Sequence, residues 1–250
     1  MLRRQGVRFI ASTIRQRGDP ALERVCPPLS TEILRHPMEP CITKFPLVCP
    51  AAESTPAFGR NKYVRTAPSL VSLDAMVADL HEALEEFRKT SGYGRGIAGP
   101  QLGYFARVIA LNLNGEKHTL INPEWVCKSK ETFTMWDDCF SHPDELVRVR
   151  RHVGGDIRFT TTRGDFLEWM NLDQGTCELL QHEMDHLDGL LSFRRAEPVK
   201  VPSTSRLASE FRSSLAFDAS GRLSVVPRRV WEAAKADCMK LVSPQHQDTE

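Results

Sequence analysis

The stretch that decides how this chain is interpreted is Leu179–Leu191, L-L-Q-H-E-M-D-H-L-D-G-L-L. It contains no proline and has good helical propensity up to Gly189, so it predicts a helix. Four residues make slightly more than one helical turn, which places the imidazoles of His182 and His186 on one face, where a single metal ion can bridge them. Glu183 would then lie beside a metal-bound water as a general base, as in the H-E-x-x-H motif.

A pair of histidines on a helix is often only exposed, or hydrogen-bonded within a core. This helix, however, is apolar nearly all round, because leucine or methionine occupies positions 179, 180, 184, 187, 190 and 191. An apolar circumference predicts a buried helix. Burying two imidazoles and a carboxylate is costly unless they are paired or bind a metal. The segment therefore predicts a metal site.

Composition sets the class of protein. The 250 residues allow one core with an appendage, and 41% hydrophobic with 26% charged residues are typical of a globular protein. A formal net charge of +1 gives no general attraction to nucleic acid, and no apolar run approaches the roughly 20 residues that a membrane-spanning helix needs. We therefore expect neither nucleic acid nor membrane as a partner. Seven cysteines without a C-x-x-C pair favour a reducing compartment over a disulfide framework.

The amino-terminal residues have the composition of a targeting segment. The first eighteen residues contain five arginines, and no acidic residue precedes Asp19. We expect residues 1–17 to be a basic leader for mitochondrial import. The alternative is a frayed basic terminus on a cytoplasmic protein.

The pattern along the chain predicts an α+β fold. Apolar residues recur at helical spacing from Ser72 to Thr90, with Ser72 as the N-cap and Gly92 just beyond the end. A glycine-rich turn at 94–99 follows. Strand-forming residues are then concentrated in four segments, 105–113, 119–122, 146–150 and 156–162.

Two further parts of the chain lie outside this pattern. Residues 28–67 are rich in proline and predict an irregular surface insertion with one short helix at 31–35. Residues 196–250 predict a helical C-terminal extension with helices near 205–217 and 229–241 and a polar tail. One apolar stripe of the second helix comprises Trp231, Ala234, Cys238 and Leu241.

Three motifs in order resemble those of the peptide deformylases. Residues 181–189, Q-H-E-M-D-H-L-D-G, are similar to the family's Q-H-E-x-D-H-L-x-G. Residues 94–101, G-R-G-I-A-G-P-Q, correspond to its G-x-G-x-A-A-P-Q, and residues 137–141, D-D-C-F-S, to its E-G-C-L-S. I-N-P at 121–123 and the segment from Gly18 add weaker matches. The resemblance implies a deformylase-like domain over residues 18–195, with antiparallel or mixed sheets packed around a central helix that carries the H-E-x-x-H motif.

The resemblance also implies a function. Deformylases are hydrolases that use iron(II) or zinc(II) to remove the formyl group from N-formylmethionyl nascent polypeptides. Carried over by motif, the ligands of one divalent metal would be Cys139, His182 and His186, with Glu183 as the general base. A thiolate and two imidazoles leave a fourth position open for water. The resemblance further assigns the side-chain amide of Gln101 and the backbone N–H of Phe140 as donors to the oxyanion.

The departures from the family pattern lie where substrate would bind. Gly96 keeps the space that lets substrate approach the backbone. Asp138 replaces a glycine, and Arg95 and Glu178 stand where aliphatic side chains usually border the methionine pocket. We hypothesise that Arg95 and Glu178 form an ion pair that reshapes this pocket. Asp137 is one methylene shorter than the family's glutamate, and Asp185 could orient an imidazole.

These departures leave two alternatives open. The first is a divergent paralogue that keeps the metal site but has another substrate specificity or a non-catalytic binding role. The second is a metallopeptidase built on the same helix, which the absence of a third-ligand motif other than Cys139 disfavours. The sequence does not predict an oligomeric state.

Overall fold

The computed structural model describes residues 13–46 and 67–242, which form two compact units. Unit 1 comprises the described residues up to Pro123 together with residues 159–167 and 186–189. Unit 2 comprises residues 124–158 and 168–185 and the described residues from Leu190 onward. The chain passes from one unit to the other several times, so neither unit is a single segment of sequence.

Unit 1 begins with short elements. These are η2 (Pro20–Glu23), α1 (Thr31–Arg35), β1 (Ile42–Lys44) and β2 (Ser69–Val71), and the two strands pair antiparallel. The helix expected at 31–35 is confirmed, whereas the two strands were not foreseen. The expectation that residues 28–67 lie only on the surface is wrong for Ile42, whose side chain is buried because β1 turns it inward.

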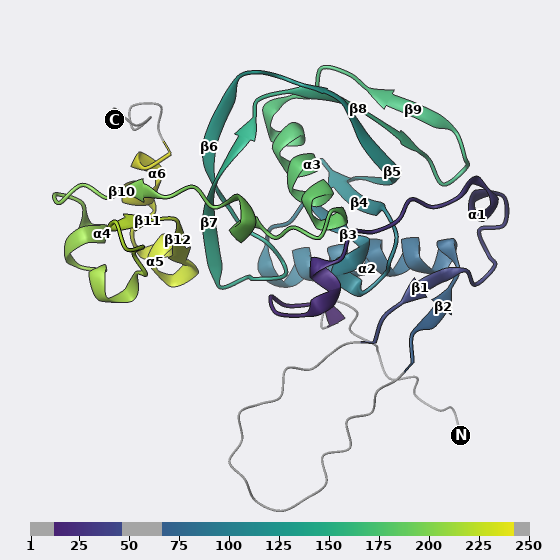
Figure 1. The fold of residues 1–250 in the computed structure, drawn as a ribbon, viewed down its shortest axis with the longest axis horizontal. Coiled ribbons are helices and arrows are strands. Elements are labelled where there is room, and N and C mark those ends of the chain that lie inside the picture. The colour runs from purple at the N-terminus through teal and green to yellow at the C-terminus, as the bar shows by residue number, and fades with distance from the viewer. Residues whose placement is uncertain (1–12, 47–66, 243–250) are drawn as a thin grey trace, which may run out of the picture. The chain divides into compact units, whose positions relative to one another are not determined.

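The long helix α2 (Leu73–Ser91) agrees with the sequence pattern. The Ser72 hydroxyl accepts a hydrogen bond from the Ala75 N–H at 3.2 Å, and Gly92 ends the helix in the left-handed conformation at φ 77°. These are the groups that satisfy free backbone donors and acceptors at helix ends. The face of α2 that includes Leu73, Met76, Leu80 and Leu84 is buried and packs on β3 and β4 (Figure 1).

A five-stranded sheet has the order β3-β4-β5-β8-β9. Its strands are β3 (Gly96–Ala98), β4 (Val108–Leu113), β5 (Glu116–Lys128), β8 (Gly155–Thr160) and β9 (Phe166–Trp169). The glycine-rich segment read as a turn is in fact the edge strand β3, followed by the 3-10 helix η3 (Gly99–Leu102). It was misread because pairing with β4, Gly96 opposite Leu111, is a long-range contact that glycine propensity does not reveal.

Unit 2 contains an antiparallel sheet of order β12-β7-β6. Its strands are β6 (Thr132–Asp137), β7 (Glu145–His152) and β12 (Val225–Pro227). The unit also contains most of α3 (Gln174–Leu187), the helix predicted from the opening stretch. The fold class is therefore α+β with antiparallel sheets, as expected.

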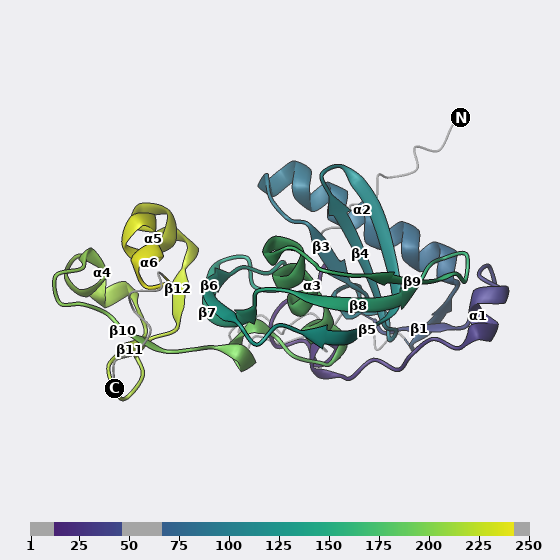
Figure 2. The same ribbon diagram turned by 90° about the horizontal axis from the view of Figure 1, so that it is seen from above.

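The C-terminal extension contains strands as well as helices. Its elements are η4 (Ser192–Arg195), β10 (Val199–Lys200), α4 (Arg206–Ser209), η5 (Arg212–Ser214), β11 (Arg222–Leu223), β12, α5 (Arg228–Ala233) and α6 (Lys235–Lys240). The expected helix at 229–241 is broken at Ala234, where φ is −134° and ψ 34°. Figures 1 and 2 show these elements gathered beside β6 and β7, and an apolar cluster joins them to Trp136 and Leu146.

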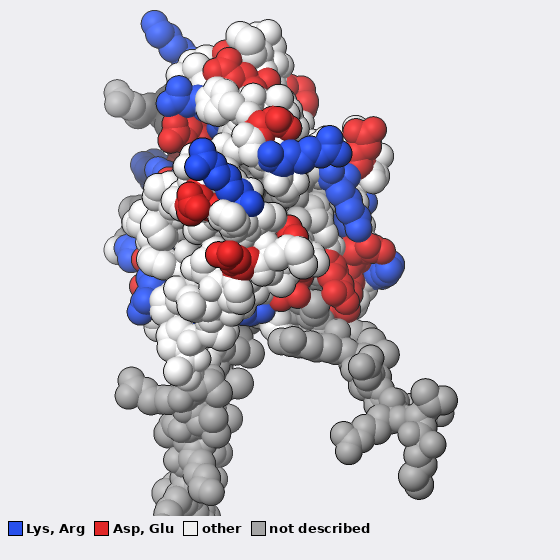
Figure 3. Space-filling view, turned by 90° about the vertical axis from the view of Figure 1, so that its right-hand side faces the viewer, with Lys and Arg blue, Asp and Glu red and all other residues white. Residues whose placement is uncertain are grey.

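The start of the described chain belongs to the folded part of unit 1. Ile14 and Arg15 are buried, the Arg15 backbone N–H donates to the Gln101 carbonyl at 2.7 Å, and its guanidinium pairs with Asp19 at 2.6 Å. The leader expected at 1–17 therefore overlaps the fold at its last residues, and residues 1–12 lie outside the described ones. Where the structure describes the chain, no helix has both the length and the apolar character needed to cross a membrane. On the face seen in Figure 3, basic and acidic side chains are interspersed.

Candidate metal centre

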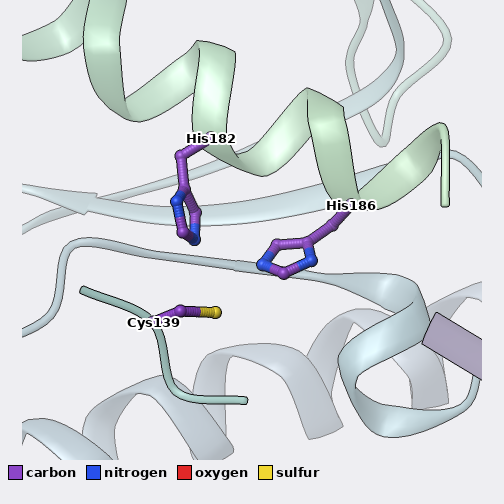
Figure 4. Close-up of side chains that lie close together, drawn as sticks. All are labelled: Cys139, His182 and His186. Atoms are coloured by element: carbon purple, nitrogen blue, oxygen red, sulfur yellow. The ribbon is translucent and has the colours of Figure 1, made fainter. Parts of the chain in front are cut away.

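Helix α3 positions two of the predicted ligands. Every residue from Cys177 to Leu187 is buried, as the apolar circumference predicted. The helix ends where the Gly189 N–H donates to the His186 carbonyl at 3.1 Å, with Gly189 at a φ of 71°. His182 and His186 project from the same side of the helix (Figure 4).

Cys139 lies two residues after the end of β6 and points toward the two imidazoles (Figure 4). One ligand atom from each of Cys139, His182 and His186 lies within 4.8 Å of the other two, and all three residues are buried. Three atoms at such separations can contact one metal ion at bonding distances of about 2.0 to 2.3 Å. The described part of the chain thus brings together the three ligands that the resemblance implied.

Hydrogen bonds to its own segment fix Cys139. The Ser141 backbone N–H donates to the sulfur at 3.4 Å, and the His142 N–H donates to the Cys139 carbonyl at 3.2 Å. The His142 ring packs edge-on against Phe193 with centroids 4.7 Å apart. A backbone N–H pointed at the sulfur favours the thiolate, the form that binds metal.

Asp137 orients the first imidazole. Its carboxylate lies 3.0 Å from Nδ1 of His182, so the Nδ1–H is the donor and the Nε2 lone pair is available for a metal. Burial alone would raise the pKa of Asp137, but His182 and then Arg151 outweigh it and hold the pKa well below its usual range. The shorter side chain therefore still reaches the histidine as a carboxylate.

Arg151 on β7 is a site residue that the sequence did not reveal. Its guanidinium contacts Asp137 at 2.7 Å and Asp185 at 2.6 Å, and its side chain is only 3% exposed. Asp185 also binds Arg195 at 2.9 Å. Asp137 is thus the carboxylate that contacts an imidazole. Asp185, which was expected in that role, instead binds Arg151 and Arg195. In the segment R-V-R-R-H at 148–152, the sequence gives no reason to expect a buried arginine. Arg151 becomes buried only when β6 and β7 pair.

Glu183 lies between the two histidines in the sequence and is 3% exposed. A thiolate, two imidazoles and an adjacent buried carboxylate fit a divalent metal with an open coordination position, because catalytic zinc and iron sites use such donor sets. The fit extends to the hydrogen-bonded carboxylate behind His182, since metal-binding histidines usually donate their second N–H to such a partner. The arrangement can activate water and accept its proton.

The other residues predicted for the site are placed individually. Phe140 is buried beside Cys139 in unit 2. In unit 1, Gly96 is buried on β3, and the buried Gln101 accepts a hydrogen bond from the Ala98 N–H at 2.9 Å. The role of Gln101 toward the metal stays a prediction.

The two unexpected charges near the predicted methionine pocket differ in exposure. Arg95 of unit 1 is exposed, while Glu178 of unit 2 is 8% exposed in the second turn of α3. Glu178 therefore lies inside the helix and does not project into solvent from its first turn. The proposed Arg95–Glu178 ion pair stays a hypothesis.

Asp138 is bound within unit 2. Its carboxylate contacts the guanidinium of Arg228, at the start of α5, at 3.2 Å. The Arg228 backbone N–H donates to the Asp144 carbonyl at 2.7 Å and its Nε–H to the Pro143 carbonyl at 2.5 Å. The sequence did not predict this contact, because 90 residues separate the two side chains.

Solved structures of peptide deformylases share this fold. The enzyme from Thermotoga maritima superposes with a TM-score of 0.53 at 23% identity, covering 74% of this chain and 97% of that one. The deformylase from Acinetobacter baumannii with Met-Ala-Ser bound gives a TM-score of 0.51 at 22% identity, covering 73% and 96%. The class that fold and site define is thus a deformylase-like α+β protein with a candidate Cys/His/His metal centre.

The sequence comparisons give the family. The polypeptide deformylase model matches residues 60–201, more than half of the chain. The peptide deformylase of Acidobacterium capsulatum is 32% identical over 133 residues, 51% of this chain and 74% of the relative. That of Thermotoga neapolitana is 34% identical over 107 residues, 43% of this chain, and the match spans 65% of the relative's length. The chain belongs to the polypeptide deformylase family.

Proposed function

We propose that this chain is a metal-dependent hydrolase that removes the formyl group from N-formylmethionyl peptides of nascent proteins. The observation that carries the proposal is the buried cluster of Cys139, His182 and His186 with Glu183 on the same helix, in a member of the deformylase family. One iron(II) or zinc(II) ion would be held by the three ligand residues. Such an ion supplies Lewis acidity toward the formyl oxygen and makes water acidic enough to ionise near neutral pH.

The residues of the chain would carry the proton transfers. The Glu183 carboxylate accepts a proton from the water that attacks the formyl carbon and delivers it to the nitrogen of the departing amine. Asp137 keeps the Nδ1–H of His182 engaged at 3.0 Å, so that Nε2 would be the nitrogen that holds the metal. The backbone N–H of Phe140 and the side-chain amide of Gln101 would donate to the developing negative charge on the formyl oxygen, each worth about 3 kcal/mol in comparable hydrolases.

The test is hydrolysis of formyl-Met-Ala-Ser by protein loaded anaerobically with iron(II). Glu183→Gln keeps the size of the side chain but cannot accept the proton, and we expect it to lower kcat by about 100-fold or more. Glu82→Gln, on the exposed face of α2, is the matched control and should leave kcat unchanged. Equal rates for wild type and Glu183→Gln would refute the assignment of the base.

A second candidate function is supported by the burial of Glu178. A carboxylate that is 8% exposed one turn before His182 would polarise a pocket made for the methionine thioether. The protein would then keep the chemistry but act on another formylated amine, or bind peptides without turnover. Arg95→Val and Glu178→Ile restore aliphatic side chains, and a gain in kcat/KM for formyl-Met-Ala-Ser in either variant would favour this alternative. If neither variant gains in kcat/KM, the result disfavours this alternative.

We further propose that the protein acts in mitochondria. The support is the basic, acid-free composition of the first residues, which resembles a transit segment. A fluorescent protein fused to residues 1–20 should accumulate in mitochondria, and a diffuse cytosolic signal would contradict the proposal.

A further inference from the structure

The C-terminal extension is joined to the strands that flank Cys139. Strand β12 pairs with β7 in the register Val225 opposite Val147. The Trp136 indole N–H on β6 donates to the Cys238 carbonyl at 2.8 Å, and the Arg148 Nε–H on β7 donates to the Leu241 carbonyl at 3.0 Å. Both strands that carry the Cys139 segment are therefore fixed by residues of the extension.

Arg228 extends this attachment to the segment itself. Residues 138–144 connect β6 to β7 and include Cys139. Arg228 binds the Asp138 carboxylate at one end of this segment, and the Pro143 and Asp144 carbonyls at the other. One side chain and its backbone thus span the loop that presents the sulfur, and the Arg228 side chain is only 22% exposed.

The charge of Asp138 gives Arg228 a second role. Asp138 adds a carboxylate next to a cysteine that must be a thiolate to bind metal, and neighbouring negative charges disfavour each other. The guanidinium at 3.2 Å offsets that charge. The E-G-C-L-S motif that residues 137–141 resemble has glycine at this position, and glycine carries no charge that a cation must balance. Asp138 and Arg228 thus form a complementary pair.

We propose that Arg228 is a positioning residue of the metal centre, through which the C-terminal extension holds the 138–144 segment and keeps the Cys139 sulfur in place for the metal. The inference rests on the proposed metal site. Arg228 acts through Asp138 and the segment backbone, and has no assigned contact with substrate. Residues that orient metal ligands typically contribute about 10- to 100-fold to metal affinity.

The experiment uses full-length protein loaded with cobalt(II). Thiolate ligation gives a sulfur-to-cobalt charge-transfer absorption, and transfer of cobalt to excess chelator gives the release rate. Arg228→Gln should release cobalt about 10-fold faster than wild type, with a weakened charge-transfer band. Arg229→Gln removes the neighbouring, exposed arginine and should behave as wild type. Arg228→Gln with Asp138→Gly should recover part of the loss, because the unbalanced carboxylate is gone.

The outcomes separate the inference from the proposed site. Equal release from wild type and Arg228→Gln overturns the role of Arg228 while leaving the metal site intact. Wild-type protein that shows no thiolate band overturns the metal site and the inference with it. If Arg228→Gln does not fold by circular dichroism, Arg228→Lys decides, because lysine keeps the positive charge opposite Asp138 but lacks the planar guanidinium that contacts Asp138 and the Pro143 carbonyl together. Faster release from that variant supports the inference, and unchanged release overturns it.

Discussion

Replacing Arg151 with methionine should destabilise the protein strongly. The guanidinium lies between Asp137 and Asp185, at 2.7 and 2.6 Å, and the Arg151 side chain is 3% exposed. Methionine keeps the length and apolar body of the side chain but removes the charge and all five N–H donors. Two buried carboxylates then lose a common cation, and each must remain charged with fewer partners or take up a proton.

The size of the effect follows from what the carboxylates retain. Breaking a buried ion pair by removing one partner costs about 3 to 5 kcal/mol. Asp185 keeps Arg195 at 2.9 Å and Asp137 keeps His182 at 3.0 Å. We therefore expect the lower end of that range, a loss of about 3 kcal/mol in the free energy of unfolding.

The neighbouring arginine provides the control. Arg150 precedes Arg151 on β7, so its side chain leaves the opposite face of the strand, where it is 40% exposed and pairs with Glu197. An exposed pair contributes about 0 to 1 kcal/mol, so Arg150→Met should change stability little. One strand thus offers two adjacent arginines with opposite expected outcomes.

The assay is urea unfolding of both variants and of wild type in the presence of a chelator, so that metal binding does not contribute. With a slope of about 3 kcal/mol per molar urea, the Arg151→Met midpoint should fall by about 1 M. Variants at 150 and 151 with the same midpoint would refute the reasoning, because they would show that burial of the Asp137 and Asp185 carboxylates does not depend on Arg151.

Three further predictions concern the rest of the fold. Gly189→Ala should cost about 2 kcal/mol or more, because φ is 71° and the new Cβ would lie 2.8 Å from the Glu23 carbonyl; unchanged thermal stability would contradict this. Ser72→Ala should cost about 1 kcal/mol through loss of the α2 N-cap, and Ser72→Asp should not. Burial raises the pKa of the Cys26 thiol to about 11, so the native protein holds this proton more tightly than the unfolded chain. The contribution of this proton to the free energy of unfolding is complete below about pH 9 and is lost as the pH rises toward 11, by at most about 3 kcal/mol. In Cys26→Ala the free energy of unfolding should therefore fall less between pH 9 and pH 11 than in wild type.

The sequence predicts those features that local pattern and chemistry determine. Helix α2 has its cap, its apolar face and its terminating glycine in order, so it was found with nearly correct bounds. Helix α3 was found from its apolar circumference around two histidines, but it spans Gln174–Leu187 and so begins and ends several residues before the predicted stretch. The ligand set required motif resemblance for Cys139, since a lone cysteine before a loop has no local signature of metal binding.

What the sequence did not predict depends on contacts between distant segments. Arg151 is indistinguishable from a surface arginine until β6, β7 and α3 enclose it. Strand β12 is three residues long and ends in a proline, which is compatible with an edge strand but too short to give an alternating pattern. The pairing of Arg228 with Asp138 likewise depends on β12 being in register with β7.

Strand β12 has a consequence for how this protein can be shortened. The family match ends at residue 201, so a fragment that stops where this match stops would omit residues 225–227. In the sheet β12-β7-β6 that omission leaves β7 with an unpaired edge, and it uncovers the apolar side chains of Trp136 and Leu146. Bare apolar strand edges promote pairing between molecules. A fragment that ends at residue 201 should therefore aggregate, and a fragment that continues to residue 242 should not.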